Sequence, residues 1–205
     1  RATEACVRNV LPSRATESIP TAAGVSLTIE RSEYKPWLHD DDGDNIFFAS
    51  IHGFGRDPPA PSYYDDEYEL AAGGAFYPGS GGPGTEQARP AVINSPMPLR
   101  TPSASWRAKM LAHVLEPLDG FKPDLIVISA GFDAHVDDPI EAGSLRDVDF
   151  AWMTSELVVM AEQHCDGRLV SLLEGGYRIT GRCVASLGRA AAEHVAELMR
   201  PSLVG

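Results

Sequence analysis

The sequence predicts an α/β domain in which a mostly parallel sheet is flanked by helices. Strand-like and amphipathic helical segments alternate along the second half of the chain, an order typical of parallel βαβ units. The run Leu125–Ser129 is apolar and rich in β-branched residues, as are strands buried on both faces of a parallel sheet. The 205 residues suffice for one well-buried domain and are too few for two ordinary ones.

The predicted elements follow one another at the spacing of such units. Ser103 or Ser105 is the expected cap of the helix predicted at 106–118, and Pro96 and Pro98 are expected to end the strand predicted at 91–94. Residues 1–44 show little periodicity and are expected to be an irregular segment or an insertion ahead of a core at 45–198. The expected strands are 46–51, 91–94, 125–129 and 168–173, and the expected helices are 106–118, 149–164 and 182–199.

Composition restricts the partners and the compartment. The chain has 17 Lys plus Arg against 29 Asp plus Glu, a formal net charge of −12. This charge argues against direct nucleic-acid binding, because phosphate contacts require a basic surface, and it suits cationic partners such as Lys-rich tails or polyamines. Cys6, Cys165 and Cys183 lack CxxC spacing and cannot all pair, and no apolar run resembles a signal peptide or a membrane span. We therefore expect an intracellular protein without a membrane partner, in the cytoplasm, the nucleus or an organelle.

The first candidate site residue is Asp133, which follows the strand predicted at 125–129. The small residues Ser129–Gly131 permit a tight turn and deliver Asp133 just beyond the carboxyl end of the strand, where open α/β sheets bind ligands. A carboxylate is costly to bury alone, so the expected companion is a metal, another cation or several N–H donors. The alternative is an aspartate that caps the following segment.

The second candidate is Tyr177, at the end of Leu172–Tyr177. Gly175 and Gly176 permit a tight turn with backbone groups open to a ligand, and they place Tyr177 at the carboxyl edge of the sheet. Tyr177 follows Asp133 by 44 residues, about one strand–helix–strand unit, as two adjacent parallel strands require. The alternative is a strand-to-helix turn whose tyrosine packs on the surface.

Both segments resemble the histone deacetylase family. Ile128–His135, followed by Asp138 and Pro139, resembles the second zinc-ligand segment of class II deacetylases and of their acetylpolyamine amidohydrolase relatives. Leu172–Tyr177 resembles the family segment whose tyrosine donates a hydrogen bond to the oxyanion. The resemblance covers roughly residues 45–198 and implies the carboxyl-terminal part of an arginase/deacetylase-like domain whose amino-terminal part is missing.

The resemblance implies an activity and a cofactor. The activity is hydrolysis of the acetyl amide of N-acetyl-lysine, in a histone or another protein, or of an acetylpolyamine. Asp133 is then a ligand of Zn²⁺, which activates water, and Tyr177 is the catalytic residue that polarises the scissile carbonyl. Gly175, Gly176 and Ile140 are the matching substrate-binding residues.

Two further segments match the family. Phe76–Gly81 is similar to the loop whose aromatic residue forms one wall of the acyl-lysine tunnel, which makes Tyr77 a substrate-binding candidate. Ser50 and Ile51 match a segment whose serine and following carbonyl help bind a structural monovalent cation, for which K⁺ is the candidate.

Part of the family pattern is absent from the sequence. No His-His dipeptide is present to act as the acid/base pair, and zinc catalysis needs three protein ligands and a position for water. Thr3–Glu4 fits the end of the first metal-ligand motif, whereas Arg1 and Ala2 depart from it. We therefore expect the other half of the domain ahead of Arg1 or on another chain, with this chain inactive alone. The alternative is a catalytically silent scaffold or assembly subunit; an Asp-x-His and a His-His upstream of Arg1 would favour the enzyme.

Overall fold

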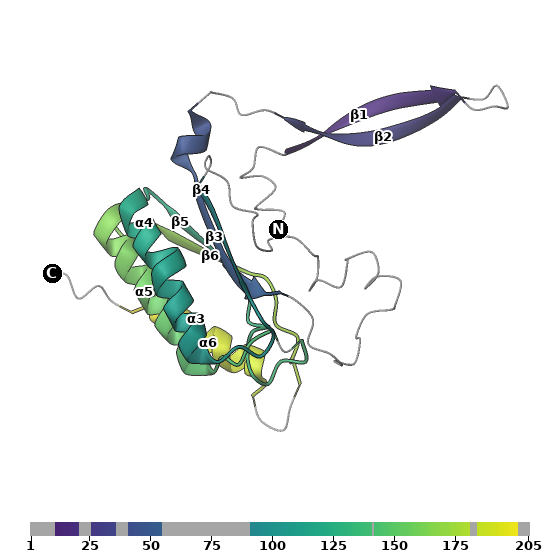
Figure 1. Cartoon of the computed structure of the whole chain (residues 1–205). Helices are drawn as coiled ribbons and strands as arrows, with labels where there is room; N and C mark the ends of the chain where they lie inside the picture. Colours follow the sequence, from purple (N-terminus) through teal and green to yellow (C-terminus); the bar gives the residue numbers. More distant parts are fainter. Residues whose placement is uncertain are drawn as a thin grey trace. The chain divides into compact units, whose positions relative to one another are not determined.

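The computed structural model describes residues 11–20, 26–35, 41–54, 91–140, 142–180 and 184–200 (Figure 1). The chain divides into two compact units, residues 1–48 with 86–92 and residues 49–85 with 93–205. All α-helices of the described residues belong to the second unit, as do Asp133 and Tyr177. None of these helices combines the length and the apolar character needed to cross a membrane.

The first unit contains an antiparallel hairpin. Strand β1 (Leu11–Pro20) pairs with β2 (Ser26–Lys35), with Leu11 opposite Lys35 and Pro20 opposite Ser26. This hairpin lies within the segment for which the sequence predicts no regular element. Side-chain periodicity detects a strand only when one of its faces is buried, whereas pairing itself is made by the backbone. A short 3₁₀ turn, η1 (Asp42–Asn45), follows the hairpin.

The strands β3 (Phe47–Gly53) and β4 (Ala91–Met97) form a two-stranded sheet. Both extend beyond the predicted carboxyl ends. Strand β4 runs through Pro96 and ends at Met97, so of the two prolines predicted to end it, Pro98 is confirmed and Pro96 is not. Proline lacks a backbone N–H, so a strand tolerates it at positions that do not donate to the ladder. Strand β3 is half-buried along most of its length and not fully buried as predicted.

The predicted βαβ unit is confirmed. Strands β5 (Ile126–Ala130) and β6 (Leu169–Leu173) are parallel, in a register that pairs Ile126 with Leu169 and Ala130 with Leu173. Helix α5 (Asp147–Cys165) connects them. Because paired residues of a parallel ladder project to the same face, the outer faces of the two strands form one surface.

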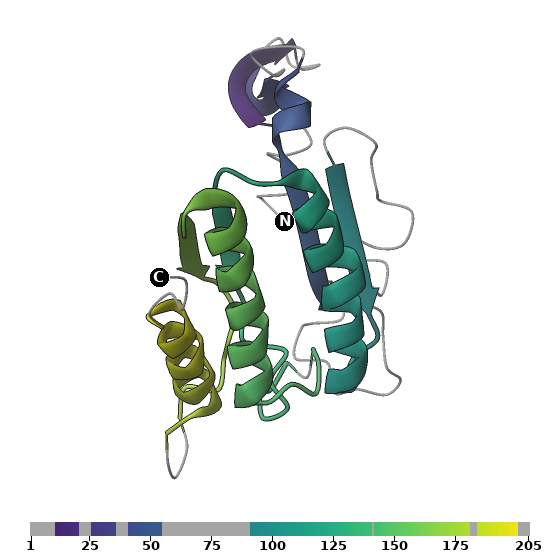
Figure 2. The ribbon, with the colours of Figure 1, turned by 90° about the vertical axis from the view of Figure 1, so that its left-hand side faces the viewer.

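Burial of β5 alternates along the strand. Ile126 and Ala130 are buried, whereas the side chain of Val127 lies on the other face and the residue is 56% exposed. The prediction of a strand buried on both faces is therefore wrong for the described residues. The reason is visible in Figure 1 and Figure 2, where the described helices lie on one side of β5 and β6.

A single helical stretch occupies the region of the first predicted helix. It consists of α3 (Ser103–Met110), a π-helical turn η2 (Leu111–Leu115) and α4 (Glu116–Phe121). In Figure 2 this stretch and α5 lie in front of the strands, and α6 (Ser186–Leu198) packs beside α5. Helix α6 begins after the predicted residue 182.

The predicted cap of α3 is wrong. Pro102 precedes the helix without a capping side chain, and the Ser103 hydroxyl donates instead to the Asp149 carboxylate. Asp149 also accepts from Arg107 Nη2 at 2.7 Å and from the Arg146 backbone N–H at 2.8 Å. Burial alone would raise the pKa of Asp149, but hydrogen bonds from Ser103, Arg146 and Arg107, with the Arg107 charge, outweigh it and lower this pKa. Asp149 thus joins α3 to the first turn of α5.

The hydrophobic core lies directly under the segment that carries Asp133. Phe132 and Ala134, the neighbours of Asp133, are both buried, and the Phe132 ring lies 5.2 Å from the Phe150 ring of α5 between centroids. Burial of both neighbours fixes the backbone at Asp133, so the core determines where this carboxylate stands. The other buried members of the cluster are Met97, Trp106, Ala130, Ala142, Leu145 and Ala190.

A buried histidine links α6, α5 and β6. Thr154 Oγ1 donates to the Phe150 carbonyl at 2.7 Å, so the same oxygen accepts from His194 Nδ1, 2.6 Å away. His194 Nε2 then accepts from the Ser171 hydroxyl at 2.7 Å. This network suits the neutral ring, and burial lowers the pKa of His194.

The lowered pKa of His194 predicts a pH dependence of stability. The unfolded chain takes up a proton at this histidine near pH 6.5, above the pH at which the folded chain does so, so the unfolding free energy should fall as the pH drops through that value. We expect His194→Asn, which cannot titrate, to show a smaller loss between pH 7 and about pH 5. Urea unfolding of both proteins across this range measures it. Equal pH slopes for parent and variant would contradict the assignment.

Candidate functional site

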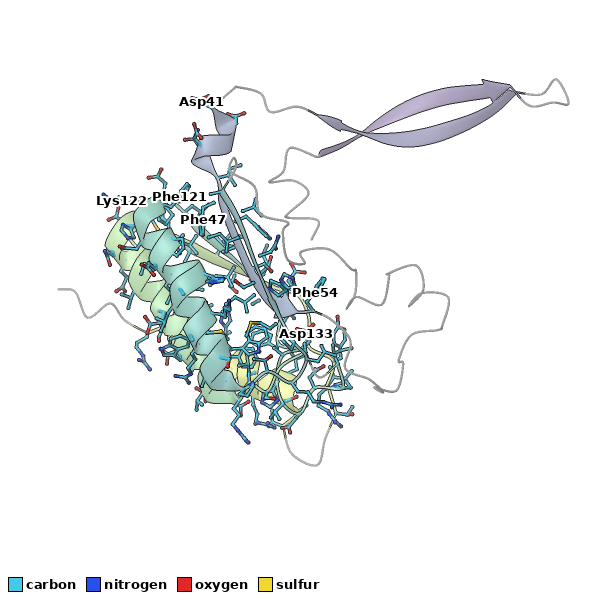
Figure 3. All side chains as sticks on the ribbon, in the orientation of Figure 1. Asp41, Phe47, Phe54, Phe121, Lys122 and Asp133 are labelled. Carbon is cyan, nitrogen blue, oxygen red and sulfur yellow. The ribbon has the colours of Figure 1, made fainter. Side chains whose placement is uncertain are left out.

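The site is built where β5 and β6 end side by side. The backbone N–H of Phe132 donates to the Gly175 carbonyl at 2.8 Å, and that of Glu174 donates to the Ala130 carbonyl at 3.0 Å. These bonds hold the segment after β5 against the segment after β6. The structure therefore brings Asp133 and Gly175, which the sequence predicts as site residues, into contact at the carboxyl edge of the two strands. Asp133 is labelled in Figure 3.

Glycines on both segments make room for the Asp133 carboxylate. A Cβ atom at Gly175 would lie 2.6 Å from Asp133 Oδ2, and one at Gly131 would lie 3.3 Å from Oδ1. A side chain at residue 175 would therefore displace the carboxylate. Gly175, which the sequence predicts as a site residue, is required here because the Asp133 carboxylate approaches its backbone closely.

Asp133 stands in an environment that favours a cation. Burial, and then the negative charge of Asp138, raise the pKa of Asp133 above its usual range, and the backbone N–H groups of Asp133 and Ala134 oppose the shift only in part. The next helix begins at Asp147, so Asp133 does not cap a helix. A bound metal ion would offset both the burial of this carboxylate and its repulsion by Asp138, so the position suits a metal ligand.

The glycine turn before Tyr177 is conformationally specific. Gly176 has φ +132°, and a Cβ atom there would lie 2.6 Å from Leu187 Cδ1. Only glycine satisfies both conditions without strain. Tyr177, the next residue, is 57% exposed. Tyr177 thus follows β6 on the segment that contacts Asp133 through Gly175.

Asp138 is the residue of this site that sequence reasoning missed. It is 3% exposed, and its Oδ2 accepts from the backbone N–H groups of Tyr177 at 2.7 Å and Arg178 at 3.2 Å. Its Oδ1 accepts from the Ile140 N–H at 3.0 Å. An aspartate before Pro139 does signal a local turn closed by the side chain, but nothing in the sequence indicates the bonds to residues 177 and 178.

His135 has a structural environment. It is 2% exposed, and its Nδ1 accepts from the Asp137 backbone N–H at 3.0 Å, which leaves the proton on Nε2. Nε2 donates to Asp147 Oδ1 at 3.0 Å, and the second oxygen of Asp147 accepts from Arg189 Nε at 2.9 Å. Both ring nitrogens are therefore used within the protein.

The remaining predicted site residues lie in several places. Ser50 and Ile51 lie in β3, where Ser50 Oγ is 2.9 Å from His52 Nδ1, and Ile140 and Ile51 are partly buried against the core. Tyr77 lies outside the described residues, as do Thr3 and Glu4. Within the described ranges, no group of three or more His, Cys, Asp or Glu side chains is placed to hold a metal ion. The described residues thus offer Asp133 as one candidate ligand of an incomplete set.

The described residues form a parallel βαβ unit with a carboxylate and a tyrosine after neighbouring strands. Open α/β sheets bind ligands at the carboxyl edge of their strands, which makes this edge the candidate site. Residues 41–198 match the histone deacetylase domain, and the chain belongs to this family. The arginase/deacetylase-like fold class predicted from the sequence is confirmed by the solved structures that resemble the chain.

Curated relatives carry deacetylase names. The chain is 42% identical over 110 residues to a probable deacetylase of Archaeoglobus fulgidus, an alignment covering 52% of this chain and 30% of that protein. It is 36% identical over 165 residues to the histone deacetylase-like amidohydrolase of Pseudomonas aeruginosa, covering 76% of this chain and 39% of that protein.

Solved structures of the family have the same fold. The HDA15 HD domain matches with a TM-score of 0.56 and 24% identity, over 77% of this chain and 39% of that one. The acetylpolyamine aminohydrolase from Burkholderia pseudomallei matches with a TM-score of 0.50 and 25% identity, over 76% of this chain and 38% of that one. The chain thus spans between 30% and 39% of the length of these relatives and structures.

Proposed function

We propose that the protein carrying this chain is a zinc-dependent deacetylase that hydrolyses the acetyl amide of N-acetyl-lysine or of an acetylpolyamine. The observation that carries the proposal is the contact between the Asp133 carboxylate and the Gly175 turn that leads to Tyr177. A metal ligand and an oxyanion donor must act on the same carbonyl, so they must belong to one site. Family membership and the deacetylase names of the relatives support this reading.

Asp133 would hold the zinc ion together with ligands outside the described residues. Its raised pKa and the room that the glycines leave around it fit a metal-bound carboxylate. When bound, zinc would activate a water molecule and polarise the amide carbonyl. K⁺ at Ser50 and Ile51 remains part of the proposal, as a structural ion.

The chain's own residues would position and stabilise the reacting amide. The Tyr177 hydroxyl would donate a hydrogen bond to the carbonyl oxygen, which becomes fully anionic only in the tetrahedral state. Tyr77 would supply an apolar wall for the four-carbon stem of acetyl-lysine. Gly175, Gly176 and Ile140 would line the substrate site, and the net charge of −12 would attract Lys-rich or polyamine substrates.

The outer face of β5 and β6 supports a second part of the proposal, namely that polypeptide beyond the described residues packs on this sheet. This face is apolar, and its residues Leu125, Val127, Val170 and Leu172 are between 48% and 56% exposed. Parallel sheets occur almost only with both faces covered. We infer that the amino-terminal part of a deacetylase domain, from the same polypeptide or another subunit, covers it.

Val127→Thr tests whether this face is covered in the protein that carries the chain. The substitution keeps the shape of the side chain but adds a hydroxyl, and burying that hydroxyl without a partner should lower the unfolding free energy by about 1–3 kcal/mol. Val159→Thr is the matched control, because Val159 is 54% exposed on α5; its effect should stay within about 0.5 kcal/mol. Urea unfolding of the full-length protein measures both. Equal, small effects would contradict a covered face.

The activity itself is tested by acetate release. The full-length protein carrying this chain, purified with its metal, is expected to release acetate from an acetyl-lysine peptide or from an N-acetylated polyamine. The same compounds with an N-ethyl group in place of the N-acetyl group serve as the control, because they contain no amide that could be hydrolysed. A folded protein with neither zinc nor acetate release would contradict the proposal and favour a silent scaffold subunit.

A further inference from the structure

The turn that carries Tyr177 is bound to one buried carboxylate. Asp138 Oδ2 accepts from the Tyr177 backbone N–H at 2.7 Å and from the Arg178 backbone N–H at 3.2 Å. The Arg178 side chain adds a bond from its Nε to the Asp137 carbonyl at 2.9 Å. The segment after β6 is therefore fixed to the segment after β5 at the position of the tyrosine itself.

The chemistry of Asp138 suits an anchor. The residue is 3% exposed, and both of its carboxylate oxygens accept backbone N–H bonds, with Oδ1 bound to the Ile140 N–H at 3.0 Å. Hydrogen bonds to a charged acceptor are stronger than neutral ones, and their loss at a buried site leaves the N–H groups without partners. The bond to Tyr177 holds the backbone nitrogen next to the Cα atom from which the ring projects.

We propose that Asp138 is a positioning residue that holds Tyr177 in the orientation needed to stabilise the oxyanion. The inference rests on the proposed deacetylase function. It assigns Asp138 no contact with substrate or metal, because its oxygens are directed to the backbone of residues 140, 177 and 178. Small displacements of a stabilising group are costly in catalysis, so the anchor affects turnover through Tyr177.

The test is Asp138→Asn in the full-length protein that carries this chain. Asparagine keeps the shape but has one acceptor oxygen, so it cannot serve both the Ile140 N–H and the turn at residues 177 and 178. We expect kcat on an acetyl-lysine peptide to fall about 10–100-fold, with KM and zinc content close to the parent values. Asp137→Asn is the matched control, because it removes the neighbouring charge from a side chain that is 58% exposed, and it should keep parent kcat.

Amide hydrogen exchange supplies a readout that is independent of activity. Exchange at the Tyr177 and Arg178 amides should become faster in Asp138→Asn and stay at the parent rate in Asp137→Asn. Unchanged exchange at these amides would overturn the anchor, and so would an unchanged kcat beside an active parent. If Asp138→Asn lost zinc in proportion to its loss of kcat, the substitution would act on the metal ligand Asp133. That result would overturn the proposal that Asp138 acts by positioning Tyr177.

The two proposals fail in distinguishable ways. A parent protein without acetate release contradicts the deacetylase function, and the exchange rates then decide the anchoring alone. An active parent whose Asp138→Asn variant keeps both its kcat and its exchange rates leaves the function intact and removes Asp138 from it.

Discussion

Asp133→Asn is expected to abolish stoichiometric zinc binding by the full-length protein that carries this chain. The substitution replaces an anionic oxygen ligand with a neutral amide of the same shape. Removal of a residue that only hydrogen-bonds to a metal ligand lowers metal affinity by about 10–100-fold. Loss of a charged ligand itself should therefore weaken zinc binding by about 100-fold or more. The space around residue 133 is unchanged, because the room left by Gly131 and Gly175 accepts an isosteric side chain.

Metal analysis of the purified variant and a competition titration with a zinc chelator measure this effect. Asp137→Asn, which removes an exposed carboxylate four residues away, should retain parent affinity and controls for net charge. Stoichiometric zinc with parent affinity in Asp133→Asn would refute the ligand assignment.

Tyr177→Phe is expected to lower kcat about 10²–10³-fold, or by roughly 3–4 kcal/mol in the barrier, through loss of one oxyanion donor. The ring and its packing remain, and the carbonyl oxygen carries its full charge only in the tetrahedral state. The loss should therefore fall on turnover and leave KM and zinc content nearly unchanged. Steady-state kinetics on an acetyl-lysine peptide, beside an active parent, measure it. Equal turnover would show that Tyr177 is only a turn residue.

The parts of the fold that the sequence predicts well are those with a local signal. The apolar runs of β5 and β6, and the separation of 44 residues in sequence between Asp133 and Tyr177, imply adjacent parallel strands. The two strands pair in this way. Gly175 and Gly176 signal a tight turn in the sequence. The structure shows why both are glycine, because a Cβ atom at either position would lie too close to a neighbouring side chain.

Other features depend on residues far apart in the chain. Ser103 donates to Asp149 instead of capping its own helix, and Asp138 binds the backbone of Tyr177, 39 residues later. A sequence of one chain does not indicate which distant donor a carboxylate will meet. The apolar run at β5 also predicts burial on both faces, whereas the described helices cover one face. Burial of the second face depends on chain that lies elsewhere in the sequence or in the assembly, and the run itself does not identify that chain.

The most direct test of the account is metal removal from the full-length protein that carries this chain. Acetate release from an acetyl-lysine peptide is measured before chelation, after chelation and dialysis, and after addition of one equivalent of zinc. We predict that activity disappears with the metal and returns with zinc in the parent, and that it does not return in Asp133→Asn at the same zinc concentration. Full activity in the metal-free protein would contradict the account.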